Sequence, residues 1–116
     1  DQLTILADRI QLQQVLLNLV RNSIEAIEKQ SAPKLIKIKC YKPNKLEVEF
    51  SVLDNGPGIP DAMISDMLTP VRSNKDNGMG MGLCISNHIV SSHGGTLWID
   101  SSRTNGACVI FRIPNR

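Results

Sequence analysis

Aromatic residues are scarce in this chain of 116 residues, which holds two Phe, one Tyr and one Trp. Aromatic rings supply much of the buried area in most cores, so Ile, Leu, Val and Met must build the core here. The apolar share of 41% is nevertheless ordinary for a globular protein, and the length fits one domain. The composition therefore predicts a single globular domain with an aliphatic core.

Long apolar runs and concentrated charge are also missing. No run approaches the length of a membrane span, and no signal peptide is visible. The net charge is only +2, and Lys and Arg are spread along the chain, which is not the footprint of a nucleic-acid-binding protein. We therefore expect no nucleic acid partner. Because the first residue is Asp rather than Met, we expect a piece of a longer protein, for which membrane anchoring stays open.

The three cysteines, Cys40, Cys84 and Cys108, form a poor disulfide framework because their number is odd and their spacing is wide. No two of them have the CxxC spacing of a zinc site. Each lies in an apolar run, so we expect buried free thiols. Free thiols favour a reducing compartment.

The hydrophobic pattern first predicts a strand over 3–5, a helix from about Arg9 to Gln30, and two strands over 36–40 and 46–52 that are joined by a turn at 42–45. It then predicts helices over 61–68 and 81–93. Strands over 96–100 and 108–113 follow them. Consecutive hairpins in this order predict an α+β fold. We expect a two-layer sandwich of a mostly antiparallel mixed sheet, with about three helices on one face and a polar outer face. The lysines of 36–40 and the glutamates of 46–52 should be cross-strand neighbours on that outer face.

A polar stripe runs along the first predicted helix. Gln14, Asn18, Asn22 and Glu25 are spaced by four, four and three residues and share one narrow face. Asn is a poorer helix former than the Lys and Glu of an ordinary exposed face, so two of them point to amides aimed at a ligand. An ordinary solvated face is the alternative.

The segment Asp54-Asn55-Gly56-Pro57-Gly58-Ile59 follows an apolar strand directly. Such residues mostly form plain turns, and a plain turn is the alternative here. This connection, however, does not lead into another strand. Glycines two apart let a ligand approach the backbone, and a carboxylate at the strand end can accept a hydrogen bond in a pocket.

Two further segments could meet an anion. The loop 69–77 carries Arg72 and Lys75, which could pair with phosphate oxygens, although the loop taken alone reads as solvated. Gly78, Gly80 and Gly82 lie at the start of the predicted helix, which runs from about residue 81 to residue 93 and whose N-terminus offers free N–H groups and the positive end of its dipole. A flexible hinge is the alternative. The glycine pattern fits neither a P-loop nor a dinucleotide-binding turn.

Taken in order, these features resemble the ATP-binding catalytic domain of bacterial sensor histidine kinases. That domain belongs to the superfamily shared with gyrase, a heat-shock chaperone and a mismatch-repair ATPase. Residues 16–26 (LLNLVRNSIEA) look like the N box, 54–59 (DNGPGI) like the first glycine box and 78–83 (GMGMGL) like the second. The resemblance covers essentially the whole chain, taken as one domain over 1–116, and implies the ATP-lid sandwich fold.

The resemblance implies ATP and Mg²⁺ as cofactors, with roles assigned by matching position. Asn22 would coordinate Mg²⁺, and Asp54 would accept the adenine amine. Residues 69–77 would form a lid that is mobile without nucleotide and ordered with it, although the family's aromatic residues before the lid are absent here. The implied nucleotide-binding residues are Asn22, Asp54, Gly56, Gly58, Ile59, Ser73, Lys75, Gly78, Gly80, Gly82 and Leu83.

Asn18 stands where the hydrolysing members of the superfamily carry a Glu that activates water. An amide cannot act as a general base, so the resemblance implies phosphoryl transfer to a histidine rather than hydrolysis. Neither His88 nor His93 is followed by the acidic residue typical of the acceptor. We therefore expect the acceptor on a separate N-terminal helical domain, outside this chain.

The resemblance also implies partners and a location. We expect the chain's own N-terminal histidine domain and a response regulator as partners, a monomeric isolated domain, a dimeric full-length kinase and a cytoplasmic location. Two alternatives stay open: a degenerate kinase that binds nucleotide without transferring phosphate, and a conformational ATPase of the same superfamily.

Overall fold

The computed structural model describes residues 9–30, 33–58, 79–100 and 106–114. These segments contain helix α1 (Arg9–Ile27), strands β1 (Ile36–Asn44) and β2 (Glu47–Asp54), helix α3 (Met79–Ser92), and strands β3 (Thr96–Ile99) and β4 (Cys108–Pro114). Their order is the predicted one. The strand expected over 3–5, the helix expected over 61–68 and the loop 69–77 lie outside the described residues.

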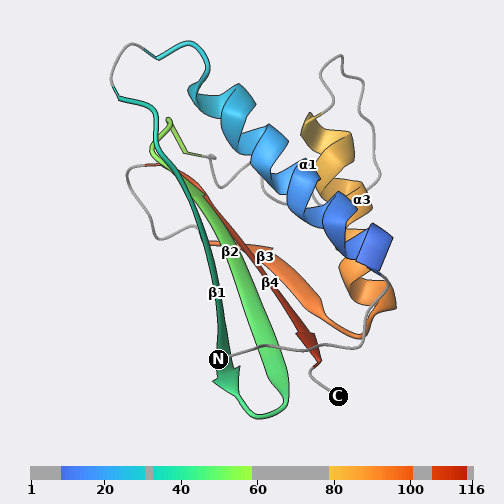
Figure 1. Cartoon of the computed structure of the whole chain (residues 1–116). Coiled ribbons are helices and arrows are strands. Elements are labelled where there is room, and N and C mark those ends of the chain that lie inside the picture. Colours follow the sequence, from blue (N-terminus) through green and yellow to red (C-terminus); the bar gives the residue numbers. More distant parts are fainter. Residues whose placement is uncertain (1–8, 31–32, 59–78, 101–105, 115–116) are drawn as a thin grey trace.

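The four strands form one sheet in the order β1-β2-β4-β3, and every described pairing is antiparallel. Helices α1 and α3 cover the same face of this sheet and run in opposite directions (Figure 1). The predicted two-layer α+β architecture is therefore confirmed for the described part of the chain. Within that part the sheet is purely antiparallel rather than mixed, and it carries two helices.

The core lies between the helices and the sheet and is almost wholly aliphatic. Phe50 of β2 and Phe111 of β4 lie opposite each other in the sheet, and their rings stack with centroids 4.8 Å apart. The buried core residues are Val15, Leu19, Val52, Leu83, Ile89, Val90, Leu97, Ile99, Val109, Phe111 and Ile113. Apolar residues recur at helical spacing in α1 and alternate in β4, as amphipathic elements with one buried face require.

The first hairpin extends further than the predicted turn allows. Strand β1 continues through Pro43 to Asn44, and its pairing with β2 shifts register between Tyr41 and Asn44. Pro43 is tolerated because it lies within this irregularity of an edge strand, where the regular ladder of hydrogen bonds is interrupted. The turn itself is Lys45-Leu46, where Asn44 Oδ1 accepts a hydrogen bond from the N–H of Leu46 at 2.7 Å.

Both helices also differ at one boundary from the prediction. Helix α1 ends at Ile27 rather than near Gln30, and α3 begins at Met79, so Gly80 lies inside the helix rather than before it. The predicted stop of α3 at two glycines is confirmed. Gly94 has a φ of 80°, and the N–H of Gly95 donates to the carbonyl of Val90 at 2.9 Å, which is the usual C-terminal cap.

The expected pairing of lysines with glutamates across the first hairpin is wrong. Lys39 lies opposite Ser51, and Glu49 lies opposite Tyr41. The lysines of β1 and the glutamates of β2 therefore lie on the same face of the sheet but are not directly opposite each other. Lys39 and Glu49 are offset by two residues along the strands. The register is set by the turn at Lys45-Leu46, two residues later than the turn signal indicated.

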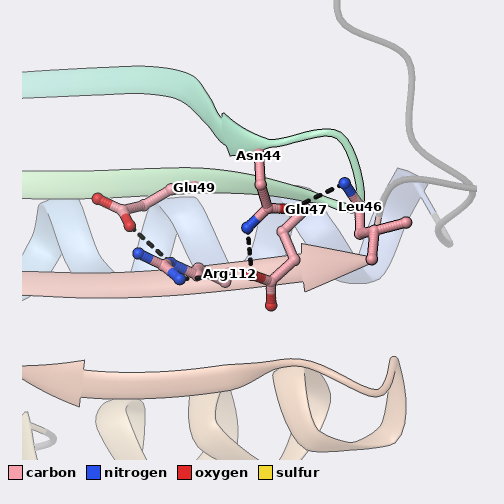
Figure 2. A network of polar contacts seen from close by, with 5 residues as sticks. All are labelled: Asn44, Leu46, Glu47, Glu49 and Arg112. Carbon is pink, nitrogen blue, oxygen red and sulfur yellow. Dashed lines mark hydrogen bonds and ion pairs between the residues drawn. The ribbon is translucent and has the colours of Figure 1, made fainter.

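The glutamates of β2 instead meet an arginine of β4. Arg112 Nε donates to Glu49 Oε1 at 2.7 Å, and Arg112 Nη1 donates to Glu47 Oε1 at 3.3 Å (Figure 2). The guanidinium also lies 5.6 Å from the ring centroid of Trp98, close enough for a cation–π contact. The outer face is therefore polar as expected, but through a network that joins β2 to β4 and includes an aromatic ring.

The three cysteines have different surroundings. Cys108 is buried, Cys84 is half-buried and Cys40 is exposed, and none of the three forms a disulfide. The prediction of a buried thiol is wrong for Cys40 because it lies on the edge strand β1, where Ile38 on the same side is also 57% exposed. In the described part of the chain, no helix is both long and apolar enough to cross a bilayer.

Candidate functional site

Helices α1 and α3 meet through polar side chains near the beginning of α3. Asn18 Nδ2 donates to Ser86 Oγ at 3.3 Å. One turn earlier in α3, a Cβ placed on Gly82 would lie 3.6 Å from Asn22 Oδ1 and 3.9 Å from Asn18 Cβ. The two amides that the sequence singled out therefore lie against the second predicted glycine box.

The predicted polar stripe of α1 divides into two parts. Asn18 and Asn22 are half-buried against α3, whereas Gln14 and Glu25 are exposed. The stripe straddles the edge of the contact between the helices, so the reading of two amides aimed inward fits Asn18 and Asn22, and the alternative of a solvated face fits the outer pair. The two amides belong to the site, and the outer pair forms an ordinary solvated face.

The amide of Asn22 makes fewer hydrogen bonds than it can. Its Nδ2 group is buried and has no hydrogen-bond partner among the described residues. An unpaired buried donor costs about 1–3 kcal/mol, and folded proteins contain few of them. A carboxamide offers both donors and an acceptor, so Asn22 can meet a phosphate oxygen and a cation at once. The unpaired donor fits a bound group that supplies the missing partner.

Asp54 ends strand β2, and the residue as a whole is only 5% exposed. Its Oδ1 accepts hydrogen bonds from the N–H of Gly56 at 2.8 Å and the N–H of Ala107 at 3.2 Å. These two donors fix the plane of the carboxylate. Among the described residues no donor meets Oδ2, so this oxygen can accept a hydrogen bond from a ligand.

The turn after Asp54 lies against the end of α1. A Cβ on Gly56 would lie 3.3 Å from the carbonyl oxygen of Ala26, one helical turn beyond Asn22. The Asp54 turn and Asn22 therefore lie at the same end of α1. Gly58 has a φ of 85°, in the left-handed region that favours glycine.

Gly106 belongs to this site, although the sequence pattern indicated only a connection between strands. Its φ is 87°, and a Cβ on it would overlap the carbonyl oxygen of Asp54. The next residue, Ala107, accepts a hydrogen bond from the Asp54 N–H at 3.0 Å while its own N–H holds Oδ1. The Asn-Gly signal was visible, but this contact depends on the pairing of β2 with β4, which no local pattern reveals.

Asn55 was also missed, and it ties the segment before β1 to the Asp54 turn. Its Oδ1 accepts hydrogen bonds from the N–H of Leu35 at 3.0 Å and from Gln30 Nε2 at 3.2 Å, and its Nδ2 donates to the carbonyl of Pro33 at 2.8 Å. These side-chain bonds add to a backbone bond from the Asn55 N–H to the carbonyl of Leu35 at 3.2 Å.

The other predicted site residues are placed less fully. Leu83 is completely buried, with its side chain in the core. Ile59, Ser73, Lys75 and Gly78, together with Arg72, lie outside the described residues. The phosphate contacts expected of Gly80, Gly82 and the N–H of Leu83 stay predictions.

Neither histidine lies at the site. His88 is exposed, and His93 Nδ1 donates to the carbonyl of Ile89 at 2.9 Å. Both follow Ser86 toward the C-terminal end of α3, whereas the amides lie near its beginning. This placement agrees with the expectation that neither histidine is the phosphoryl acceptor.

A model of the family of histidine kinase-, DNA gyrase B- and HSP90-like ATPases matches residues 7–116. The match includes both amides, the Asp54 turn, Gly82 and the Gly106 segment. The chain therefore belongs to this family of ATPase domains, as the sequence motifs predicted.

Individual relatives narrow the class. The sensor protein FixL of Bradyrhizobium diazoefficiens is 38% identical over 110 residues, which are 95% of this chain and 22% of FixL. The catalytic domain of the histidine kinase ThkA is 38% identical with a TM-score of 0.81, over 96% of this chain and 70% of that one. Within the family, this chain is a histidine kinase catalytic domain of the kind found in two-component systems, and it spans about a fifth of FixL.

Two more solved structures contain a similar domain in larger assemblies. Full-length ShkA in complex with AMPPNP matches 98% of this chain, and the match covers 23% of ShkA with 28% identity and a TM-score of 0.79. ThkA in complex with the response regulator TrrA matches all of this chain, and the match covers 32% of ThkA with 34% identity and a TM-score of 0.81.

Proposed function

We propose that this chain binds ATP·Mg and donates the γ-phosphoryl group to a histidine on a separate helical dimerisation domain, in two-component signalling. The observation that carries the proposal is the buried Nδ2 of Asn22, which has no partner among the described residues, on a side chain that lies beside Gly82 at the same end of α1 as the Asp54 turn. The AMPPNP complex of ShkA supports a nucleotide as the ligand.

Asp54 would recognise the adenine base. Its Oδ1 is occupied by two N–H donors, and Oδ2 would accept the exocyclic amine of adenine. Guanine carries an oxygen at the corresponding position, and two acceptors repel each other. Gly56 and Gly58 would shape the pocket around the ring, and Ile59 would pack on it. The site should therefore prefer adenine nucleotides.

Asn22 would act at the triphosphate. Among the described residues, no group of three His, Cys, Asp or Glu side chains could hold a metal ion. Mg²⁺ usually takes only one or two ligands from the protein and the rest from phosphates and water. Asn22 Oδ1 would be such a ligand, while Nδ2 would donate to a phosphate oxygen. Ser73, Lys75, Gly78 and Gly80 would complete the phosphate contacts.

Asn18 favours transfer to histidine over hydrolysis. Its amide is engaged by Ser86 and cannot take a proton from water. A histidine is itself a nucleophile, so the chain's task would be positioning and charge neutralisation. The acceptor histidine would lie on the helical domain and a response regulator would receive the phosphoryl group, in line with the ThkA–TrrA complex. The chain alone should bind nucleotide and turn over little ATP.

Calorimetric titration of the chain with AMPPNP and Mg²⁺ tests this proposal. The wild type should bind, and Asp54→Asn should bind at least about tenfold more weakly, because a lost hydrogen bond to a buried charge costs about 1.5–3 kcal/mol. Glu47→Gln, on the outer face of the sheet, is the matched control and should bind like the wild type. A wild type that does not bind, or an unchanged affinity of Asp54→Asn, would refute the proposal.

A further inference from the structure

Ser86 is a completely buried hydroxyl on a mostly apolar side of α3. It is 0% exposed, and over 82–92, where the burial of this helix is described, the other buried residues are Leu83, Ile89 and Val90. A buried hydroxyl costs free energy unless it is hydrogen-bonded. Serine in a helix often bonds a carbonyl of its own helix, but here the bond crosses to Asn18 of α1 at 3.3 Å.

This bond lies directly beside the site. Ser86 follows Gly82 by one helical turn and Asn18 precedes Asn22 by one turn, so the two contacts are adjacent between antiparallel helices (Figure 1). The core around them is apolar, and apolar burial has no preferred direction. A hydrogen bond does depend on angle and distance. The bond between Asn18 and Ser86 therefore fixes how α1 is rotated against α3 where Asn22 lies.

We propose that Ser86 is a positioning residue for the phosphate end of the nucleotide. It holds the amide of Asn18 and thereby sets the space between Asn22 and the beginning of α3. This inference rests on the proposed function, in which Asn22 meets Mg²⁺ and a phosphate. Ser86 itself touches no nucleotide atom, and Asn18 acts through the contact between the helices because its Nδ2 is engaged.

A purely structural role for Ser86 makes a different prediction. A serine that only stabilises the fold would affect every ligand of the folded domain equally. A serine that positions Asn22 affects ligands in proportion to their contact with Mg²⁺ and phosphate. Two ligands separate the roles: AMPPNP with Mg²⁺ uses the whole site, and ADP without Mg²⁺ depends mainly on the base pocket around Asp54.

We expect Ser86→Ala to weaken AMPPNP·Mg binding by about three- to tenfold, the usual effect of one hydrogen bond, and to change Mg-free ADP binding by less than about twofold. Asn18→Ala should show the same selective loss. The double variant should be no weaker than either single one, because two residues that act through one bond are not additive. Ser91→Ala, the same change at an exposed position of α3, is the control and should leave both affinities unchanged.

Equal losses for the two ligands, or additive losses in the double variant, would overturn the positioning role while leaving the proposed function intact. Should Ser86→Ala not fold, which circular dichroism would show, Asn18→Ala alone decides: a selective loss supports the inference and an unselective one overturns it. A wild type that binds neither ligand would refute the proposed function, and the inference with it.

Discussion

Two polar clusters lie on opposite faces of the same sheet, and their hydrogen-bonding groups are satisfied to different degrees. On the outer face, Arg112 donates to both Glu49 and Glu47, so opposite charges neutralise each other (Figure 2). On the helix side, the described residues give no partner to Asn22 Nδ2, and the two N–H donors that they offer to Asp54 both meet Oδ1. Folded proteins rarely leave buried polar groups unpaired, so the incomplete cluster indicates where a ligand binds.

The two clusters should therefore respond differently to mutation. A change in the outer cluster removes a bond that the folded chain already has, so it should lower stability and leave nucleotide binding alone. A change in the inner cluster removes a group that is satisfied only with ligand, so it should alter binding more than stability. Sequences tend to break local rules at functional sites, and Asn22 is such a place.

Gly106→Ala should have the largest effect, because Gly106 packs against the backbone of Asp54 and so supports both the fold and the cluster of Asn22 and Asp54 on the helix side. The added Cβ would overlap the carbonyl oxygen of Asp54 at a φ of 87°, so the free energy of unfolding should fall by about 3 kcal/mol or more. Nucleotide binding should be lost as well. Urea unfolding and calorimetry measure both. Gly94→Ala, at a φ of 80° on an exposed turn, is the control and should cost only about 1–2 kcal/mol without loss of binding.

Glu49→Gln should lower stability alone. It keeps the shape of the side chain but removes the charged acceptor of Arg112 Nε, and a charge-assisted hydrogen bond contributes about 1.5–3 kcal/mol. AMPPNP affinity should not change. Glu47→Gln, at the longer and more exposed contact of 3.3 Å, should cost less than about 1 kcal/mol. A loss of nucleotide affinity in Glu49→Gln would contradict the claim that the outer cluster does not affect nucleotide binding.

Gly82→Ala should have the opposite effect to Glu49→Gln, because it should lower nucleotide affinity without lowering stability. The nearest atom to the new Cβ is Asn22 Oδ1 at 3.6 Å, so the methyl group fits, and alanine favours a helix by about 1 kcal/mol over glycine. Thermal unfolding should therefore show an equal or higher stability. AMPPNP·Mg affinity should fall, because the methyl group takes space beside Asn22. Unchanged affinity would remove Gly82 from the site.

Tyr41→Phe should have the smallest effect. The hydrogen bond from Tyr41 to the Glu49 carboxylate raises the pKa of the phenol, so its contribution to stability is present below the unfolded pKa of about 10 and is lost as the pH rises through the folded pKa. The wild type should be slightly more stable than the variant at neutral pH, and this difference should vanish in strong alkali. Because Tyr41 is the single tyrosine, its absorbance titration reads the pKa directly. A normal tyrosine pKa would contradict the bond.

The order of elements could be predicted because each depends on neighbours along the chain. Leucines at helical spacing marked α1, and alternation marked β2 and β4. The position of a strand within the sheet could not be predicted in this way. Cys40 and Ile38 have the same alternation as a covered strand, yet they are exposed because β1 lies at the edge. The register of Lys39 against Ser51 likewise depended on a turn whose signal lay two residues off.

The candidate site was only partly visible in the sequence. Asn22 and Asp54 were predicted from their motifs, and the structure places both at the same end of α1. Gly106 and Ser86 were not, because each acts on a residue far away in the chain: Gly106 on the backbone of Asp54, and Ser86 on Asn18, 68 residues earlier. No periodicity or spacing encodes such contacts.

The sequence by itself determined the aliphatic core, the succession of helices and strands, and the residue types of the glycine-rich and amide-bearing motifs. These follow from side-chain pattern and backbone preference, which act over a few residues. Only the tertiary structure decided which polar groups are satisfied. Glu49 meets Arg112 because β2 pairs with β4 in one register, whereas the buried Nδ2 of Asn22 meets no partner in the part of the chain that the structure describes. Satisfaction of a buried group depends on what packs against it, and packing is set by the whole fold.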